Sequence, residues 1–441
     1  MRHEYIETLI IGGGQAGLAM SDMLSQRRLP HLIVEQHRIA ERWRSERWTG
    51  LRFQFPNWSI RLPGYKFEHA DPNGFATSGE IVDFLTAYAV FIKAPVRSGV
   101  KVTALRQQSG RPDFVAETSG GPIEAGNVVV ATGPYQRPVI PDLLAGNSRV
   151  FQVHASAYKD PDQLPAGSCL IVGSGASGTQ IAEELQRAGR RVFLSVGRHK
   201  RVPRRYRGQD LMWWLGELGL DKTTAAKRGP DKTLPLITGA YGGHTIDFRE
   251  LAQQGISLLG RVTAASGDTL AIEADLSASL VAGDKTYFAF LDMVDEHVQR
   301  SGMNAPAEPS ARIRKEEPAC VTAPIAQVDL MKEGITSIIW ATGYTFDFGW
   351  IDLPVLDSSG EPKHRDGVTD VPGLYFLGLP WLSKLNSSFL SGVGRSRVGR
   401  TYSKEQRCPL AFGHGSRTDL ISYRFRYATG GPSFTHSRRS P

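Results

Sequence analysis

The stretch of sequence that decides the fold lies close to the start of the chain and reads Leu9-Ile10-Ile11-Gly12-Gly13-Gly14-Gln15-Ala16-Gly17. A short apolar run enters a Gly-x-Gly-x-x-Gly turn, and residues 18–24 follow with helical spacing. In a strand–turn–helix unit of this kind the first glycine allows the tight turn, the second lets the backbone approach a pyrophosphate, and the third lets the helix pack on the strand. The pyrophosphate then binds free N–H groups at the positive end of the helix.

A second apolar run, His31-Leu32-Ile33-Val34, completes this unit and ends in an acid, Glu35. A carboxylate at this position is placed to accept hydrogen bonds from a ribose 2′-OH. The combination favours dinucleotide binding over an ordinary strand–helix turn, which matches the glycine pattern alone by chance. The residues predicted to hold this first nucleotide are Gly12, Gly14, Gln15, Ala16, Gly17 and Glu35.

The same pattern recurs in Cys169-Leu170-Ile171-Val172-Gly173-Ser174-Gly175-Ala176-Ser177-Gly178. In the register that aligns the two fingerprints, Glu35 corresponds to Val196, and Arg198 and Lys200 follow. A carboxylate there would repel a 2′-phosphate, whereas Arg and Lys bind one. The first site therefore suits FAD and the second NADPH, held by Gly173, Gly175, Ser177, Gly178, Arg198 and Lys200. The alternative for residues 198–201 is a solvated basic loop.

Three further stretches are predicted to border the nucleotides. The strand end Val128-Val129-Val130-Ala131-Thr132-Gly133 recurs as Ser337-Ile338-Ile339-Trp340-Ala341-Thr342-Gly343, and each Ala-Thr-Gly would turn the chain beside a bound nucleotide. A last strand over 371–379 brings Gly378 close to the flavin. The aromatic loop 38–58, which contains Trp43 and Trp48, would cover a ligand, or its aromatics simply plug an edge of the core.

The composition of this chain of 441 residues limits the classes of protein to which it can belong. Its 41% hydrophobic and 22% charged residues are typical of globular proteins, and its apolar runs are far shorter than the ~20 residues that cross a bilayer. The first strand begins almost at Met1, so we expect no signal peptide. The three cysteines are widely spaced without a CxxC pair, which argues against a disulfide framework, a metal site and a redox dithiol. We expect a reducing cytoplasm, with no integral membrane segment.

The net charge of +8 belongs to the last part of the chain. Residues 395–441 contain ten Lys or Arg and two acids, while residues 1–394 carry equal numbers of both signs. The charge therefore does not indicate that the folded body binds nucleic acid. The tail has no periodic apolar pattern, so we predict that it is an out-of-frame or replaced, mostly disordered C-terminus. A functional basic tail that binds nucleic acid or membrane is the alternative.

With these motifs the chain resembles the class B flavoprotein monooxygenases, the flavin-containing monooxygenase family. It is particularly similar to the bacterial branch often labelled as flavoproteins involved in K⁺ transport. The resemblance runs from about residue 5 to Gly394 and rests on the two fingerprints and the two Ala-Thr-Gly turns. Of the family signature Phe-x-Gly-x-x-x-His-x-x-x-aromatic only the second half is present, from His154 to Tyr158. Ser148 and Val150 stand where the Phe and Gly are expected.

The resemblance implies a reaction and a fold. NADPH reduces FAD, O₂ forms a C4a-hydroperoxyflavin, and one oxygen passes to a small N or S nucleophile or to a ketone. The family's flavin-side Asn corresponds to Gln54, which we carry over as the one catalytic candidate. The alternatives are a flavoprotein reductase or oxidase without oxygen insertion, and a redox sensor that binds both nucleotides. A homodimer is left open.

The sequence thus predicts an α/β protein with two Rossmann-like dinucleotide-binding domains, each a parallel sheet with helices and a small β-meander. Residues 1–164 and 326–394 would form a discontinuous FAD domain, with an NADPH domain over 165–325 inserted into it. Residues 395–441 would form the atypical tail.

Overall fold

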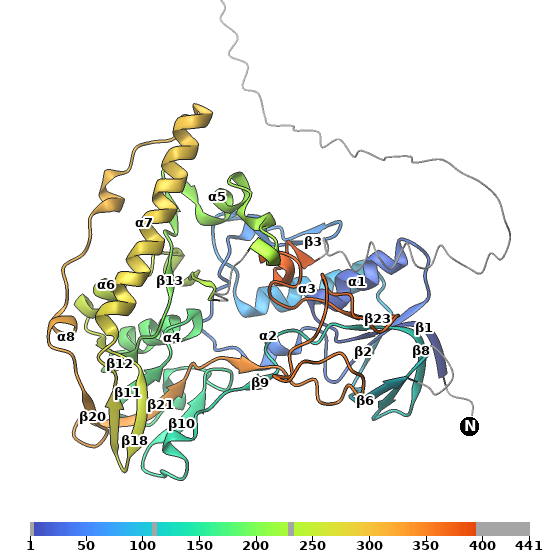
Figure 1. Ribbon diagram of the computed structural model, residues 1–441, viewed down its shortest axis with the longest axis horizontal. Coiled ribbons are helices and arrows are strands. Elements are labelled where there is room, and N and C mark those ends of the chain that lie inside the picture. Colours follow the sequence, from blue (N-terminus) through green and yellow to red (C-terminus); the bar gives the residue numbers. More distant parts are fainter. Residues whose placement is uncertain (1–3, 108–112, 228–232, 394–441) are drawn as a thin grey trace, which may run out of the picture.

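The computed structural model describes residues 4–107, 113–227 and 233–393 of the chain. Two lobes lie side by side, each built on a largely parallel sheet (Figure 1). The two-sheet α/β architecture predicted from the repeated fingerprint is therefore confirmed. The predicted tail, 395–441, lies outside the described residues.

The first lobe holds a seven-stranded sheet in the order β5-β2-β1-β8-β7-β6, with β23 parallel to β8. Strands β1, β2, β5, β8 and β23 are parallel, while β6, β7 and β8 form an antiparallel meander. The bounds are β1 Glu4–Ile11, β2 His31–Glu35, β5 Val96–Ser98, β6 Val102–Gln107, β7 Phe114–Thr118, β8 Ile123–Val130 and β23 Leu374–Phe376.

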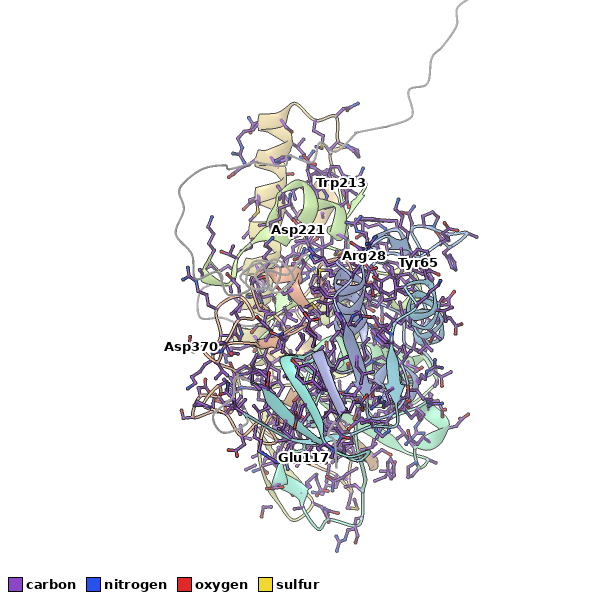
Figure 2. All side chains as sticks on the ribbon, turned by 90° about the vertical axis from the view of Figure 1, so that its right-hand side faces the viewer. Arg28, Tyr65, Glu117, Trp213, Asp221 and Asp370 are labelled. Carbon is purple, nitrogen blue, oxygen red and sulfur yellow. The ribbon has the colours of Figure 1, made fainter. Side chains whose placement is uncertain are left out.

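Helices α1 (Gln15–Ser25) and α3 (Ser78–Phe91) pack on this sheet. Helix α3 begins with a capping box between Thr77 and Glu80, which satisfies two free N–H groups at its first turn. Tyr65, labelled in Figure 2, packs its ring on Phe84 of α3 at 5.4 Å. The apolar face of α3 thus covers the first lobe's core.

The second lobe holds a five-stranded parallel sheet in the order β10-β21-β11-β12-β17. A separate antiparallel sheet of β18, β19 and β20 lies in the same lobe. The bounds are β10 Phe151–His154, β11 Ser168–Val172, β12 Val192–Ser195, β17 Ser257–Leu259, β18 Val262–Ser266, β19 Thr269–Ile272, β20 Gln327–Asp329 and β21 Ile335–Trp340.

The sheets divide the chain at different places from the predicted boundaries. Residues 151–154 and 335–340 lie within the predicted first domain, but they form β10 and β21 of the second sheet, where β21 pairs with β11 on one side and with β10 on the other. Ile338 and Ile339 are fully buried there, so β21 is a central strand of the second sheet. The two crossings between lobes pair with each other instead, because β9 (Arg137–Pro138) is antiparallel to β22 (Tyr344–Thr345).

The remaining elements connect or flank the sheets. The longest described helix, α7 (Leu276–Ser301), is followed by Gly302, whose φ of 66° is the left-handed conformation that closes many helices. No helix of the described ranges is both long and apolar enough to cross a membrane. The other bounds are α2 Glu41–Ser45, α4 Ala176–Arg187, α5 Leu211–Glu217, α6 Phe248–Gln253, α7 Leu276–Ser301, α8 Ala319–Thr322, β3 Arg61–Leu62, β4 Tyr65–Lys66, β13 Lys200–Arg201, β14 Arg205–Tyr206, β15 Gln209–Asp210 and β16 Pro235–Leu236.

Candidate functional site

A single cavity of about 860 Å³ is lined from both lobes. The turns after β1 and β11 both open into it, as do the turns after β8 and β21. Of the predicted site residues, those that line it are Gly12, Gly14, Gln15, Ala16, Glu35, Trp43, Trp48, Gln54, Thr132, Gly133, Gly175, Ser177, Arg198, Gly343 and Gly378. The two fingerprints, more than 150 residues apart in sequence, thus face one space.

The first fingerprint has the geometry of an anion cradle. Gly14 is the N-cap of α1, and no side chain caps the helix, so its first N–H groups stay available for a ligand. A Cβ added at Gly14 would meet nothing within 4 Å. At Gly17 a Cβ would lie 2.0 Å from the carbonyl oxygen of Gly12, so this glycine serves the contact between helix and turn.

Glu35 stands at the end of β2 beside this cradle. Its Oε2 accepts a hydrogen bond from the Gly13 N–H at 2.7 Å, and its Oε1 accepts one from the His37 N–H at 2.9 Å. Each carboxylate oxygen keeps a second lone pair. The side chain is therefore fixed in place and can still accept bonds from a ribose.

The second fingerprint repeats the first. Gly175 is the N-cap of α4 without a capping side chain, and a Cβ there would also meet nothing within 4 Å. At Gly178 a Cβ would lie 1.9 Å from the carbonyl oxygen of Gly173. Gly17, Gly173 and Gly178 do not line the cavity, because they are the positions where backbone packs on backbone.

The basic run after β12 divides into residues that face the cavity and residues that do not. Arg198 is exposed, lines the cavity, and has no ion-pair partner among the described residues. Lys200 lies outside the cavity and already has an interaction partner. Arg201 turns inward, where it pairs with Asp247 at 2.6 Å and with Asp284 at 2.9 Å. Among the Arg and Lys side chains of this run, as far as the structure describes the chain, Arg198 is the one that lines the cavity where a phosphate could bind.

The two Ala-Thr-Gly turns reach the cavity through their glycines. Gly133 and Gly343 have φ of 74° and 85°, a conformation that favours glycine. Thr132 lines the cavity, but Thr342 does not, because its hydroxyl donates to the carbonyl oxygen of Val139 in the linker. At Gly378 a Cβ would lie 2.6 Å from the Cβ of Ala16, so the segment just after β23 packs on the start of α1.

The aromatic loop forms one wall of the cavity. Trp43, Phe53, Phe55 and Phe389 follow one another with ring centroids 5.8, 5.5 and 4.8 Å apart. Gln54 stands between Phe53 and Phe55 in the sequence and lines the cavity. Its side-chain amide has no hydrogen-bond partner in the part of the chain that the structure describes. The loop thus offers one free amide within an apolar wall.

Sequence reasoning missed a cation in this wall. The guanidinium of Arg47 lies 5.2 Å from the ring of Trp43 and 5.3 Å from that of Tyr135, which is cation–π range. Arg47 Nη1 donates to the neighbouring Glu46 carbonyl oxygen at 2.8 Å, and no carboxylate of the described residues pairs with the guanidinium. Trp43 is close to Arg47 in the sequence, but Tyr135 comes from a distant segment, and a contact of that kind leaves no local sequence pattern.

His154, from the partial family signature, links the lobes. Its Nδ1 accepts from the Ser156 N–H at 3.1 Å, so Nε2 carries the proton and donates to the carbonyl oxygen of Gly343 at 3.1 Å. Burial lowers the pKa of His154, which keeps the ring neutral. Tyr158 donates its hydroxyl to Glu184 of α4 at 2.8 Å. The signature residues therefore hold the Gly343 turn and α4 in place rather than react.

Comparison with known proteins shows the family to which the chain belongs. The model of the pyridine nucleotide-disulphide oxidoreductase family matches residues 9–214. An uncharacterized CzcO-like oxidoreductase of Geobacillus kaustophilus is 33% identical over 398 residues, which cover 89% of this chain and 96% of that protein. The chain belongs to the CzcO-like oxidoreductases. A probable indole-3-pyruvate monooxygenase, YUCCA1 of Arabidopsis thaliana, is 26% identical over 96% of this chain and 94% of its own.

The fold of this CzcO-like oxidoreductase is also that of a solved flavin-containing monooxygenase. The Stenotrophomonas maltophilia protein superimposes with a TM-score of 0.60 at 16% identity, covering 91% of this chain and 98% of its own. The predicted family is therefore confirmed, and the protein is an oxidoreductase. The predicted cofactor pair agrees with these relatives, since two open cradles with uncapped helix starts fit one FAD and one pyridine nucleotide. The described residues contain no cluster of His, Cys, Asp and Glu that could hold a metal ion.

Proposed function

We propose that the protein is an NADPH-dependent flavoprotein monooxygenase that transfers one atom of O₂ to a small N or S nucleophile or a ketone, while the other atom leaves as water. The observation that carries this proposal is the single cavity into which both nucleotide cradles and the aromatic wall open. When bound, FAD would accept hydride from NADPH and, once reduced, activate O₂. The relative named as an indole-3-pyruvate monooxygenase supports this reaction type.

The protein's own residues bind and orient the two nucleotides. The N–H groups after Gly14 hold the FAD diphosphate, and Glu35 accepts from a ribose hydroxyl. The N–H groups after Gly175 hold the second diphosphate, and Arg198 meets the 2′-phosphate that distinguishes NADPH from NADH. A buried valine, Val196, stands where a carboxylate would repel that phosphate.

The aromatic wall excludes water and presents Gln54. Phe53, Phe55 and Phe389 make this part of the cavity apolar, which protects a reactive oxygen species from water and strengthens each hydrogen bond. The Gln54 amide can donate a hydrogen bond to the oxygen that is transferred. The cationic Arg47 at the other end of the wall can bind an anionic group of a cofactor or of the substrate.

A reductase that passes electrons to another acceptor is the competing function. The three cysteines of the sequence form no CxxC pair, and Cys169 is buried in β11, which disfavours a dithiol mechanism. Reduction of the purified protein with NADPH, followed by O₂ in the presence of amines, thioethers or ketones, tests the proposal. We expect oxygenated product in proportion to NADPH consumed. Peroxide alone with every substrate class would favour an oxidase, and no NADPH oxidation at all would favour a sensor.

The cellular setting stays a prediction. A reducing cytoplasm is expected from the cysteine usage.

A further inference from the structure

Gln54 is held in place by an arginine from the other lobe. Nη1 of Arg204 donates a hydrogen bond to the backbone carbonyl oxygen of Gln54 at 2.6 Å. The arginine side chain is only 2% exposed. It comes from the segment just before the hairpin β14–β15 of the second lobe, about 150 residues after its acceptor in the chain. We propose that Arg204 is a positioning residue that fixes the Gln54 amide in the cavity.

Arg204 is itself held rigidly. Its Nε and Nη2 form a two-pronged pair with the carboxylate of Asp210, at 3.0 and 2.9 Å. Asp210 also accepts from the Met212 N–H at 2.8 Å as the N-cap of α5, so the carboxylate has fixed bonds on both sides. The ring of Phe75 lies 4.7 Å from the guanidinium. With two of its nitrogens committed to Asp210, only Nη1 is left to reach Gln54.

The carbonyl group of Phe53, next to Gln54 in the loop, is also held by a residue of the second lobe, Gly239. Gly239 packs so closely on Phe53 that a Cβ there would lie 1.9 Å from the Phe53 carbonyl oxygen. The Phe53 N–H donates to the carbonyl oxygen of Ala76 at 2.7 Å. Arg204 Nη1 also reaches the Thr238 carbonyl oxygen at 3.4 Å, which joins the two contacts. The backbone of 53–54 is thus clamped by the second lobe, while the Gln54 side chain remains free to face the cavity.

This inference rests on the proposed function, because Gln54 acts on a transferred oxygen only if the protein is a monooxygenase. The positioning role of Arg204 can nevertheless be tested without catalytic turnover. If the clamp sets where the amide lies, then loosening it changes the surroundings of the bound flavin. That change can be read from the visible circular dichroism of the oxidised FAD without any substrate.

The test uses Arg204→Lys and Asp210→Asn in the full-length holoprotein. Lysine keeps the buried charge but lacks the fork that serves Asp210 and Gln54 together. Asparagine keeps an oxygen for the Met212 N–H but weakens the hold on Arg204. The matched control is Arg207→Lys. Arg207 lies on the same hairpin as Arg204's neighbours and pairs with Asp295 of α7 at 2.6 Å, and no bond from Arg207 to the Gln54 loop is found among the described residues.

We expect the first two variants to raise the peroxide formed per NADPH by about two- to tenfold, the range of one lost hydrogen bond. They should leave the rate of flavin reduction by NADPH within about twofold of wild type. They should also alter the circular dichroism of the bound flavin. Arg207→Lys should change neither the peroxide yield nor the dichroism. In a Gln54→Ala background, Arg204→Lys should add nothing further to either signal.

Additive effects of Arg204→Lys and Gln54→Ala, or equal effects of the Arg207→Lys control, would overturn the positioning role. Wild-type dichroism and coupling in Arg204→Lys would overturn it as well. If the wild-type protein yields only peroxide with every substrate class, then the monooxygenase proposal has failed. In that case the dichroism of the same double variant still decides whether Arg204 acts through Gln54.

Discussion

Replacing Gly14 by alanine should separate cofactor binding from folding. Gly14 has φ of −87° and ψ of −172°, which alanine adopts without strain, and the added methyl group would meet no protein atom within 4 Å. The lower entropy of the unfolded chain would stabilise the apoprotein by about 0.4–1 kcal/mol. Alanine is a poorer N-cap than glycine, which offsets most of this gain, so we expect the stability to change by less than about 0.5 kcal/mol.

The effect on FAD should be much larger. The methyl group would occupy the space through which the diphosphate approaches the start of α1, and would push it away from the N–H groups there. The loss of one charge-assisted hydrogen bond costs about 1.5–3 kcal/mol, so the Kd of FAD should rise about ten- to a hundredfold.

Two assays and two further variants complete this experiment. Urea unfolding of the apoprotein measures stability, and calorimetric titration of the apoprotein with FAD measures Kd. Gly175→Ala should weaken the second nucleotide and leave the FAD affinity unchanged, because its open cradle lies in the other lobe. Gly17→Ala should destabilise the fold itself, because its Cβ would lie 2.0 Å from the Gly12 carbonyl oxygen. An unaltered FAD affinity in Gly14→Ala would refute the assignment of the diphosphate to this turn.

Three other predictions follow from the same cavity. Arg198→Ala should raise the KM for NADPH about ten- to a hundredfold and leave NADH use unchanged, since a lost arginine–phosphate contact costs about 1.5–3 kcal/mol; parallel loss with both nucleotides would contradict it. Gln54→Ala should increase peroxide per NADPH at an unchanged rate of flavin reduction, as stopped-flow and peroxide assays can show. The lowered pKa of His154 means that the unfolded chain takes up a proton below about pH 6.5 that the folded chain does not. Stability should therefore fall as pH drops through that window, and His154→Gln should flatten the fall in urea titrations at several pH values.

Sequence reasoning placed the parts of the site that depend on local geometry. A glycine that caps a helix with open space above it, such as Gly14, and one that packs on the turn, such as Gly17, leave a fixed spacing in the chain. Glu35 follows from the same spacing. These features were predictable because a single strand–turn–helix unit contains all the atoms that they require.

Other parts of the site depend on pairing between distant segments. Strands β10 and β21 belong to the second sheet although both lie outside the range 165–325, since the sequence of a buried strand does not record which neighbour it will pair with. From the sequence, Lys200 and Arg198 are equally good candidates for binding the 2′-phosphate of NADPH. In the fold Arg198 lines the cavity and Lys200 does not. Arg201, which follows Lys200, is buried and forms ion pairs with Asp247 and Asp284.

Several contacts join the two lobes around the cavity that both cradles line. The Thr49 N–H of the aromatic loop donates to the Lys159 carbonyl oxygen at 2.8 Å, and the Ala225 N–H donates to the Ser383 carbonyl oxygen at 3.0 Å. Together with the β9–β22 pair and the bond from Arg204 to the Gln54 carbonyl oxygen, these contacts join the lobes at separate points around the cavity. A rotation of one lobe would break hydrogen bonds at several of these points at once. The loop that carries Gln54 is one of these contacts, so the aromatic wall of the cavity also helps to hold the two lobes together.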